Sequence, residues 1–336
     1  MSVTRFQEDS GLFMSLRQEL CHRLTLEGSH FVLAVSGGAD SIFLAYFFIW
    51  LRELADIKLS LAHFNHQLRP EADEMESQAL RAFAATWDLS YYQGSSSVRD
   101  LAKERKSGIE EAARFARHNF LENTRQEQMA ADPKRPVYLA IGHNADDLLE
   151  TLLINLGRGS GISGLASMPY FDGRIVRPLL ILSRTAIRSF LNTRALSYFE
   201  DASNESPEYL RNRIRMELIP LWSDILGYTP LKQAFNLSEH SREESQALDA
   251  LAKRALEEAL IERTELNLIA LTAWPSGLYY RVIDLFLKGQ LGQEYQLPAA
   301  SFSVLATKLE QLPCRASMTL AGARQLEICD WYLRLH

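Results

Sequence analysis

One short segment, residues 31–51 with the sequence FVLAVSGGADSIFLAYFFIWL, constrains the fold of this chain more than any other. Residues 31–35 form an apolar run typical of a buried strand, and residues 42–54 continue as an apolar-rich helix without an internal breaker. The turn between them consists of Ser36, Gly37, Gly38, Ala39, Asp40 and Ser41. No Gly-Lys-Ser/Thr follows, so the turn is not a Walker loop.

A glycine-rich turn between a strand and a helix N-terminus favours an anion, because free backbone N–H groups and the helix dipole both point at it. Gly37 and Gly38 allow the backbone to approach a ligand closely, and the hydroxyls of Ser36 and Ser41 add hydrogen-bond donors. A plain strand–turn–helix connection is the alternative. We favour a phosphate-binding loop, because the turn stands between a good strand and a good helix.

The composition is that of a soluble globular protein, with 47% hydrophobic and 23% charged residues in a chain of 336, a length that predicts two domains. Cys21, Cys314 and Cys329 form no CxxC pair, so we expect neither a disulfide framework nor a thiolate metal site, and a reducing cytoplasm fits. The N-terminus has no signal-peptide pattern. The most apolar window, residues 42–51, is too short to span a bilayer.

Apolar runs that alternate with helical patterns predict an α/β fold with a doubly wound parallel sheet, in which ligands bind at the carboxyl ends of the strands. Strands are expected at residues 31–35, 57–64, 90–93 and 137–141. Helices are expected at residues 1–27, 42–54, 71–89, 109–129 and 145–156. Unusual polar residues follow the first, second and fourth strands, so we expect them to converge on one edge of the sheet.

We predict a catalytic domain at residues 1–225, a smaller and mainly helical domain at 226–312, and a strand-rich end at 313–336. The sequence LGYTP at residues 226–230 is typical of a domain boundary. The net charge of −6 argues against indiscriminate nucleic-acid binding. Residues 155–215 nevertheless contain nine arginines, no lysine and five acidic residues, which is compatible with a specific polyanion or with a solvated surface.

The helix after the fourth strand carries His143, Asp147 and Glu150 at i, i+4 and i+7, which places all three on one face near its N-terminus. Carboxylates there can bind an ammonium group, hold Mg²⁺ beside phosphates or accept a proton from an attacking amine. Acidic residues that only complement the helix dipole are the alternative for any one of them.

Several basic residues allow both a functional and a structural interpretation. Arg114 can bind a phosphate or carboxylate with its guanidinium fork, or pair with Glu110 on the helix surface. His63 and His66 can hydrogen-bond a substrate or cap a turn. Arg158 stands in the glycine-rich loop of residues 157–164, which is either a connector or a lid.

Eight motifs together resemble those of one family. In chain order they are SGGADS, HFNHQLR, EEAARFAR, GHNADDLLET, RGSGISGL, RPLL followed by SR, EDASN and RNRIR. Over residues 30–220 the chain resembles bacterial tRNA(Ile)-lysidine synthases, which belong to the PP-loop ATP pyrophosphatases. Longer members carry a further C-terminal domain, so residues 313–336 either complete this fold or begin that domain.

This resemblance implies ATP-dependent ligation of L-lysine to C2 of the wobble cytidine in a tRNA(Ile) with a CAU anticodon, with release of AMP and pyrophosphate. The loop of residues 36–41 would bind ATP, and Asp40 would orient the nucleotide or Mg²⁺. Asp147 and Glu150 would bind the ammonium groups of lysine, and one of them or His143 would take the proton. Arg114 would contact the carboxylate of lysine or the phosphates.

The resemblance also implies a set of substrate- and tRNA-contacting residues. They are His63, Asn65, His66, Arg117, Arg158, Arg211, Asn212 and Arg215. The expected partners are ATP, L-lysine and the tRNA in the cytoplasm, without a membrane, while monomer and homodimer both stay open. The alternatives are a sulfur-inserting tRNA enzyme with the same ATP loop, which the scattered cysteines disfavour, and a nucleotide-binding module without catalysis.

Overall fold

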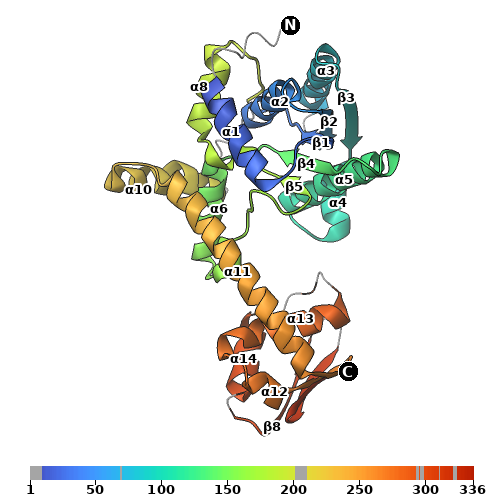
Figure 1. Cartoon of the computed structure of the whole chain (residues 1–336), viewed down its shortest axis with the longest axis vertical. Coiled ribbons are helices and arrows are strands. Elements are labelled where there is room, and N and C mark those ends of the chain that lie inside the picture. The colour runs from blue at the N-terminus through green and yellow to red at the C-terminus, as the bar shows by residue number, and fades with distance from the viewer. Residues whose placement is uncertain are drawn as a thin grey trace. The chain divides into compact units, whose positions relative to one another are not determined.

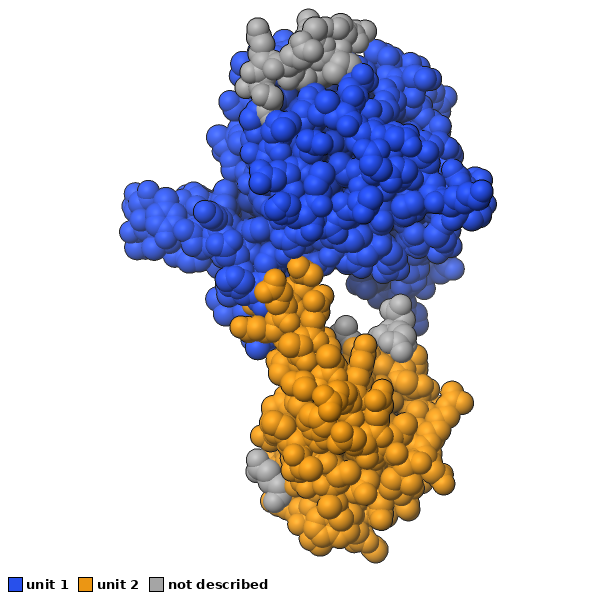
Figure 2. Space-filling model, in the orientation of Figure 1, with its two compact units in different colours: residues 1–240 blue, residues 241–336 orange. Residues whose placement is uncertain are grey.

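The structure, a computed structural model, divides into two compact units, Met1–His240 and Ser241–His336 (Figure 2). It describes residues 10–68, 70–200, 210–292, 295, 299–309, 311–320 and 324–336. Residue 69 of the HFNHQLR motif and residues 201–204 of the EDASN motif lie outside the described residues, as do residues 1–9 of the predicted leading helix. No helix in the described ranges is both long and apolar enough to cross a membrane.

Unit 1 is built on a five-stranded parallel sheet with the strand order β3-β2-β1-β4-β5 (Figure 1). Its strands are β1 (Ser29–Ala34), β2 (Ile57–Asn65), β3 (Ser90–Ser95), β4 (Val137–Ile141) and β5 (Ile175–Val176). The chain moves outward from β1 in one direction to β3 and then in the other to β5. This reversal beside β1 confirms the predicted doubly wound sheet, and it opens a crevice at the carboxyl ends of β1 and β4.

Helices connect these strands and cover both faces of the sheet. They are α1 (Ser10–Arg23), α2 (Ala39–Arg52), α3 (Pro70–Thr86), α4 (Val98–Arg105), α5 (Ile109–Ala131), α6 (Ala145–Gly157), α7 (Ile162–Leu165) and α8 (Arg184–Thr193). Phe31 and Leu33 of β1 enter the larger core with Phe47 of α2. Val32 enters a smaller core with Leu121 of α5. Because neighbouring side chains of a strand point to opposite faces, both faces of the sheet are buried.

After α8 the unit ends in helices. They are α9 (Leu210–Arg213), a π-helical turn (Ile214–Leu218), α10 (Ile219–Leu226) and the first part of α11 (Leu231–Ala259). Ala234 of α11 belongs to the larger core of unit 1, and Arg23 of α1 forms an ion pair with Glu239 of α11. These contacts place the division between the units inside α11, after His240 and later than the predicted boundary at residue 225.

Unit 2 combines helices with an antiparallel sheet of order β6-β7-β10-β9-β8. The strands are β6 (Leu260–Glu262), β7 (Glu265–Asn267), β8 (Cys314–Thr319), β9 (Gln325–Asp330) and β10 (Tyr332–Leu335). The helices are α12 (Leu268–Thr272), α13 (Tyr279–Leu291) and α14 (Ala299–Leu309). The unit has a core of its own, in which Phe286 of α13 packs with Leu333 of β10. The expected helical part and strand-rich end are both confirmed, although the sheet also recruits β6 and β7.

The core around α2 gives a stability prediction. Phe47 is fully buried. The centroid of its ring lies 5.6 Å from the ring centroid of Phe13 and 5.2 Å from that of Phe48. Replacement of Phe47 by Ala should lower the free energy of unfolding by about 3–5 kcal/mol, because buried surface is lost and a cavity remains. Urea denaturation measures this change. Met75→Ala, at a side chain 64% exposed, is the control, and equal effects of the two substitutions would contradict the packing described.

Candidate active site

The glycine-rich turn between β1 and α2 has the geometry of an anion-binding loop. Gly37 adopts φ +88°, a left-handed conformation that favours glycine. The Ser41 Oγ donates to the Gly38 carbonyl at 2.9 Å and accepts from the Ser36 N–H at 3.2 Å, which ties the two ends of the turn together. Gly38 caps α2 without a side-chain hydrogen bond. The first N–H groups of α2 therefore have no side chain of the cap residue in front of them.

The turn between β4 and α6 packs directly on this loop. A Cβ added at Gly142 would lie 3.2 Å from the Asp40 carbonyl carbon and oxygen and from the Ser41 nitrogen. Glycine at this position lets the backbones of the two turns meet. The close approach brings His143 and the start of α6 beside the loop, as expected for turns at the carboxyl ends of neighbouring parallel strands.

A pocket of about 570 Å³ opens where these turns meet. Twelve of the residues predicted for the site line it: Ser36, Gly38, Ala39, Asp40, Ser41, His63, Asn65, His66, Arg117, His143, Asp147 and Arg215. Three segments that are far apart in the sequence thus meet at one edge of the sheet, as predicted. The remaining predicted residues, Gly37, Arg114, Glu150, Arg158, Arg211 and Asn212, are not part of the pocket lining.

Asp40 is the acidic group of the loop. Burial and the nearby Asp147 carboxylate raise the pKa of Asp40 from 3.8 to about 6, because both disfavour its negative charge. Its Oδ1 is buried and has no hydrogen-bond partner among the described residues. A carboxylate in this setting gains most from a cation or a proton.

The three predicted histidines are all uncharged near neutral pH. Burial, followed by the charge of Arg177, lowers the pKa of His143 to about 3. Burial also lowers the pKa of His63, whose Nδ1–H donates to the Val35 carbonyl at 3.0 Å. Burial and Arg117 lower the pKa of His66 to about 4. These imidazoles are neutral hydrogen-bonding groups. His66 and His143 lie near arginines, and His63 and His66 lie near Asp73.

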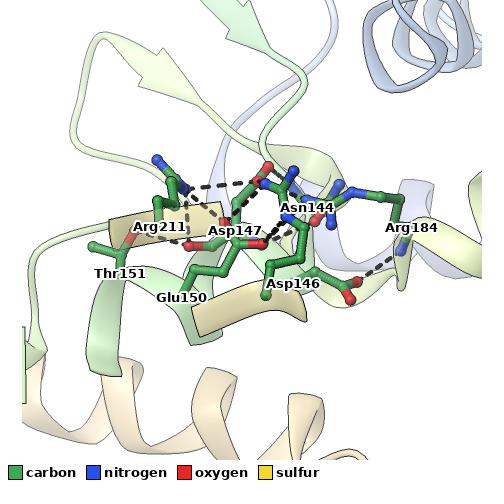
Figure 3. A network of polar contacts seen from close by, with 8 residues as sticks. Asn144, Asp146, Asp147, Glu150, Thr151, Arg184 and Arg211 are labelled. Carbon is green, nitrogen blue, oxygen red and sulfur yellow. Dashed lines mark hydrogen bonds and ion pairs between the residues drawn. The ribbon is translucent and has the colours of Figure 1, made fainter. Parts of the chain in front are cut away.

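Of the carboxylates of α6 that Figure 3 labels, that of Asp147 caps the helix and that of Glu150 is fully buried. Asn144 and Asp147 form a capping box, in which the Asn144 Oδ1 accepts from the Asp147 N–H at 3.0 Å and the Asp147 Oδ2 accepts from the Asn144 N–H at 3.1 Å. The Glu150 Oε2 accepts from the Arg211 Nε at 2.7 Å. The Glu150 Oε1 accepts from the Arg215 Nε at 2.7 Å.

Arg184, at the start of α8, joins the same network. Its Nη2 donates to the Asp147 Oδ1 at 3.0 Å and lies 3.4 Å from the Glu150 Oε1, while its backbone N–H donates to the Asp146 Oδ2 at 2.8 Å (Figure 3). Two carboxylates, Asp147 and Glu150, are thus shared by three guanidinium groups. This cluster of Asp147, Glu150, Arg184, Arg211 and Arg215 is called the α6 charge cluster below.

The α6 charge cluster differs from the predicted arrangement of these residues. Asp147 lines the pocket, whereas Glu150 is not part of the lining and both of its oxygens accept from arginines. Arg211 and Arg215, which were predicted to contact the tRNA, both donate to Glu150 on α6, and Arg215 also lines the pocket. The helical spacing that placed Asp147 and Glu150 on one face was correct, whereas the partners of Glu150 were not foreseen.

Three further predicted residues lie outside the pocket lining. Arg114 is exposed on α5, one turn from Arg117. Arg158 is exposed at the C-terminal cap of α6. Asn212 is buried in α9. The glycine-rich loop after Arg158 is fixed by the Asn155 side chain, whose Nδ2 donates to the Gly164 carbonyl at 2.8 Å and to the Ser167 Oγ.

Some site residues were not predicted from the sequence. Arg184, Arg188 and Phe199 line the pocket, and Asn144 caps α6. Asp73 and Glu76 of α3 complete the pocket wall near His66. The SR that follows RPLL contained a signal for Arg184, because a serine such as Ser183 favours a helix N-cap and Arg184 is the first residue of that helix. Phe199 offered no local signal, because its role depends on a tertiary contact.

Comparison with known proteins assigns the chain to a class. A family model described as a PP-loop domain matches residues 13–222. A tRNA(Ile)-lysidine synthase from Chlorobaculum tepidum is 33% identical over 235 residues, which are 70% of this chain and 69% of that protein. One from Geobacter sulfurreducens is 40% identical over 201 residues, 59% of this chain and 41% of that protein. The chain therefore belongs to the tRNA(Ile)-lysidine synthase family of PP-loop proteins.

The matched relatives include longer proteins. The chain covers 41% of the Geobacter sulfurreducens protein and 57% of a tRNA(Ile)-lysidine synthase from Geobacillus kaustophilus, so it spans about half the length of these curated relatives. Among solved structures, a U34-tRNA thiolase from Methanococcus maripaludis matches with a TM-score of 0.54 at 14% identity, covering 69% of this chain and 76% of that one. This likeness concerns the fold alone.

The α6 charge cluster predicts that Glu150 is needed for stability. Glu150→Gln should lower the free energy of unfolding by about 3 kcal/mol, because it leaves guanidinium groups around a buried position without their counter-charge. Chemical denaturation measures the loss. Glu217→Gln is the matched control, because Glu217 also binds an arginine, Arg213, but on the exposed surface. Equal stabilities of Glu150→Gln and the wild-type protein would contradict the cluster.

The raised pKa of Asp40 predicts that the stability of the protein depends on pH. Because its folded-state pKa is about 6 and its ordinary pKa is 3.8, the ionised carboxylate destabilises the fold above about pH 6 and not below about pH 4. Asp40→Asn should therefore stabilise the unliganded protein by on the order of 2 kcal/mol near pH 8, and the gain should vanish near pH 4. Thermal unfolding at both pH values measures it. Asp56→Asn, at a 73% exposed side chain, is the control, and a pH-independent gain would refute this assignment.

Proposed function

We propose that the protein joins L-lysine to C2 of the wobble cytidine of a tRNA(Ile) with a CAU anticodon and converts ATP to AMP and pyrophosphate. The observation that carries this proposal is the loop of residues 36–41 at the N-terminus of α2, in a chain of this family. The loop opens on a pocket that contains both carboxylates and guanidinium groups. Such a pocket suits a phosphorylated nucleotide on one side and an amine on the other.

The loop would bind the phosphates of ATP through its backbone N–H groups and the N-terminus of α2. Asp40 fits a Mg²⁺ ion that accompanies ATP, because no group in the described part of the chain bonds its Oδ1 and because burial and Asp147 disfavour its negative charge. The ion would neutralise charge on the phosphates. Asp40 would hold this ion beside the loop.

Two displacements account for the reaction. The C2 carbonyl oxygen of cytidine attacks the α-phosphate of ATP, and pyrophosphate leaves. The ε-amine of lysine then attacks C2, the C2–oxygen bond breaks, and AMP leaves with that oxygen while the amine loses a proton. We assign the lysine ammonium to Asp147, the α6 carboxylate that lines the pocket. His143 would act as a neutral hydrogen-bonding group, because its pKa of about 3 makes it a weak base.

The arginines of the pocket would bind phosphate oxygens of ATP and of the RNA. They are Arg117, Arg184, Arg188 and Arg215. Glu150 would act as a positioning residue, because its two oxygens fix the Nε atoms of Arg211 and Arg215 and so restrict the directions of both guanidinium groups. A target base in a single-stranded anticodon loop can be unstacked and presented to the pocket.

The sulfur-inserting alternative finds no support at the pocket. Cys21 lies on α1, and Cys314 and Cys329 lie on β8 and β9 of unit 2. None of the residues that line the pocket is a cysteine. A relay of sulfur through paired cysteines would need thiolates next to the activated base.

The decisive experiment measures product formation with purified protein, ATP, Mg²⁺, L-lysine and a tRNA(Ile) transcript that has a CAU anticodon. We expect labelled lysine to enter the RNA with equal amounts of AMP and pyrophosphate released. The control is the same transcript with a GAU anticodon, which lacks the target cytidine and should incorporate no lysine. Lysine-independent AMP release at the full rate, or no incorporation into the CAU transcript, would refute the proposal.

A further inference from the structure

A short segment after α8 lies against the phosphate loop. The Phe199 N–H donates to the Gly37 carbonyl at 2.9 Å, and Gly38 and Phe199 form an isolated parallel β-bridge. Tyr198, Phe199 and Glu200 all line the pocket. The loop is therefore held from two sides, by this segment and by the turn at Gly142.

The ring of Phe199 covers Gly37. A Cβ added at Gly37 would lie 2.9 Å from the Phe199 Cδ2, closer than real Cβ contacts come. Gly37 therefore has two separate reasons to be glycine, its φ of +88° and the ring above it. The contact is made by a δ-carbon, since the Cε2 and Cγ atoms of the ring lie at 3.7 and 3.8 Å.

The hydrogen bond from Phe199 sets the direction of a loop N–H group. The Gly37 carbonyl and the Gly38 N–H belong to one planar trans peptide, so they point in opposite directions. Holding the carbonyl on Phe199 turns the Gly38 N–H away from that residue and prevents the peptide from flipping. Gly38 lines the pocket and caps α2, so its N–H is one of the donors that a phosphate would meet.

We propose that Phe199 is a positioning residue for the nucleotide, which it serves by fixing the conformation of the phosphate loop at Gly37. This inference rests on the proposed binding of ATP at that loop. Phe199 acts through Gly37 and Gly38 and takes no part in the bond changes. Binding to a preformed loop does not include the free-energy cost of ordering its backbone. Loss of the ring adds that cost and therefore lowers the affinity for ATP.

Direct binding of Mg-ATP to the full chain, without tRNA or lysine, tests the inference by titration calorimetry. Phe199→Ala keeps the backbone N–H but removes the ring that seats it against Gly37, so the loop must be ordered on binding and the Kd for ATP should rise about tenfold. Phe199→Leu keeps a δ-carbon over Gly37 and should remain close to the wild-type protein. Affinity for the tRNA, measured separately, should not change in either variant, whereas general damage to unit 1 would lower both affinities.

Phe171→Ala is the matched control. Phe171 is also a half-buried aromatic residue in an isolated β-bridge of unit 1, but it does not line the pocket. If Phe199→Ala does not fold, Phe199→Val, which keeps an apolar side chain without a δ-carbon, replaces it with the same expectation. Wild-type affinity for ATP in the folded variant would overturn the positioning role alone. No ATP binding by the wild-type protein would overturn this role and the proposed function together.

Discussion

The fully buried carboxylate of Glu150 is the interaction on which the shape of the candidate active site depends. An ionised group without contact to water is strongly unfavourable unless opposite charges and hydrogen bonds surround it. Glu150 obtains them from Arg184 at the start of α8, from Arg211 of α9 and from Arg215 of the π-helical turn. Segments that are separate in the sequence are thus drawn to one side of α6.

The same cluster determines the local charge beside the pocket. Asp147 and Glu150 carry two negative charges, and Arg184, Arg211 and Arg215 carry three positive ones, so one positive charge remains. Arg117 and Arg188 add to it on the pocket wall. The same wall also carries Asp40, Asp73, Glu76 and Glu200, so the pocket presents charges of both signs to a ligand. Carboxylates inside this surface fix the arginine geometry and lower the affinity for anions that do not match it.

The features that the sequence revealed are those encoded locally. The loop from Ser36 to Ser41 stands between a buried strand and an apolar helix, so its conformation and place followed from neighbouring residues. The parallel sheet followed from the alternation of strands and helices. The partners of Glu150 could not be found in this way, because Arg211 and Arg215 lie 61 and 65 residues away in the sequence. A carboxylate on a helix face has the same spacing whether it binds a substrate amine or a structural arginine.

The contact of Phe199 with the phosphate loop is a second feature that could not be predicted from the sequence. It connects the phosphate loop with the α6 charge cluster. The backbone of Phe199 pairs with the loop through a tertiary contact with Gly37 and Gly38, which the residues around Phe199 do not encode. The chain from Arg184 to Arg215 contributes first to the α6 charge cluster, then to the phosphate loop through Phe199, and then to the cluster again. Under the proposed function, the acceptor and the nucleotide would therefore bind beside neighbouring described parts of this chain, the arginines for one and Phe199 for the other.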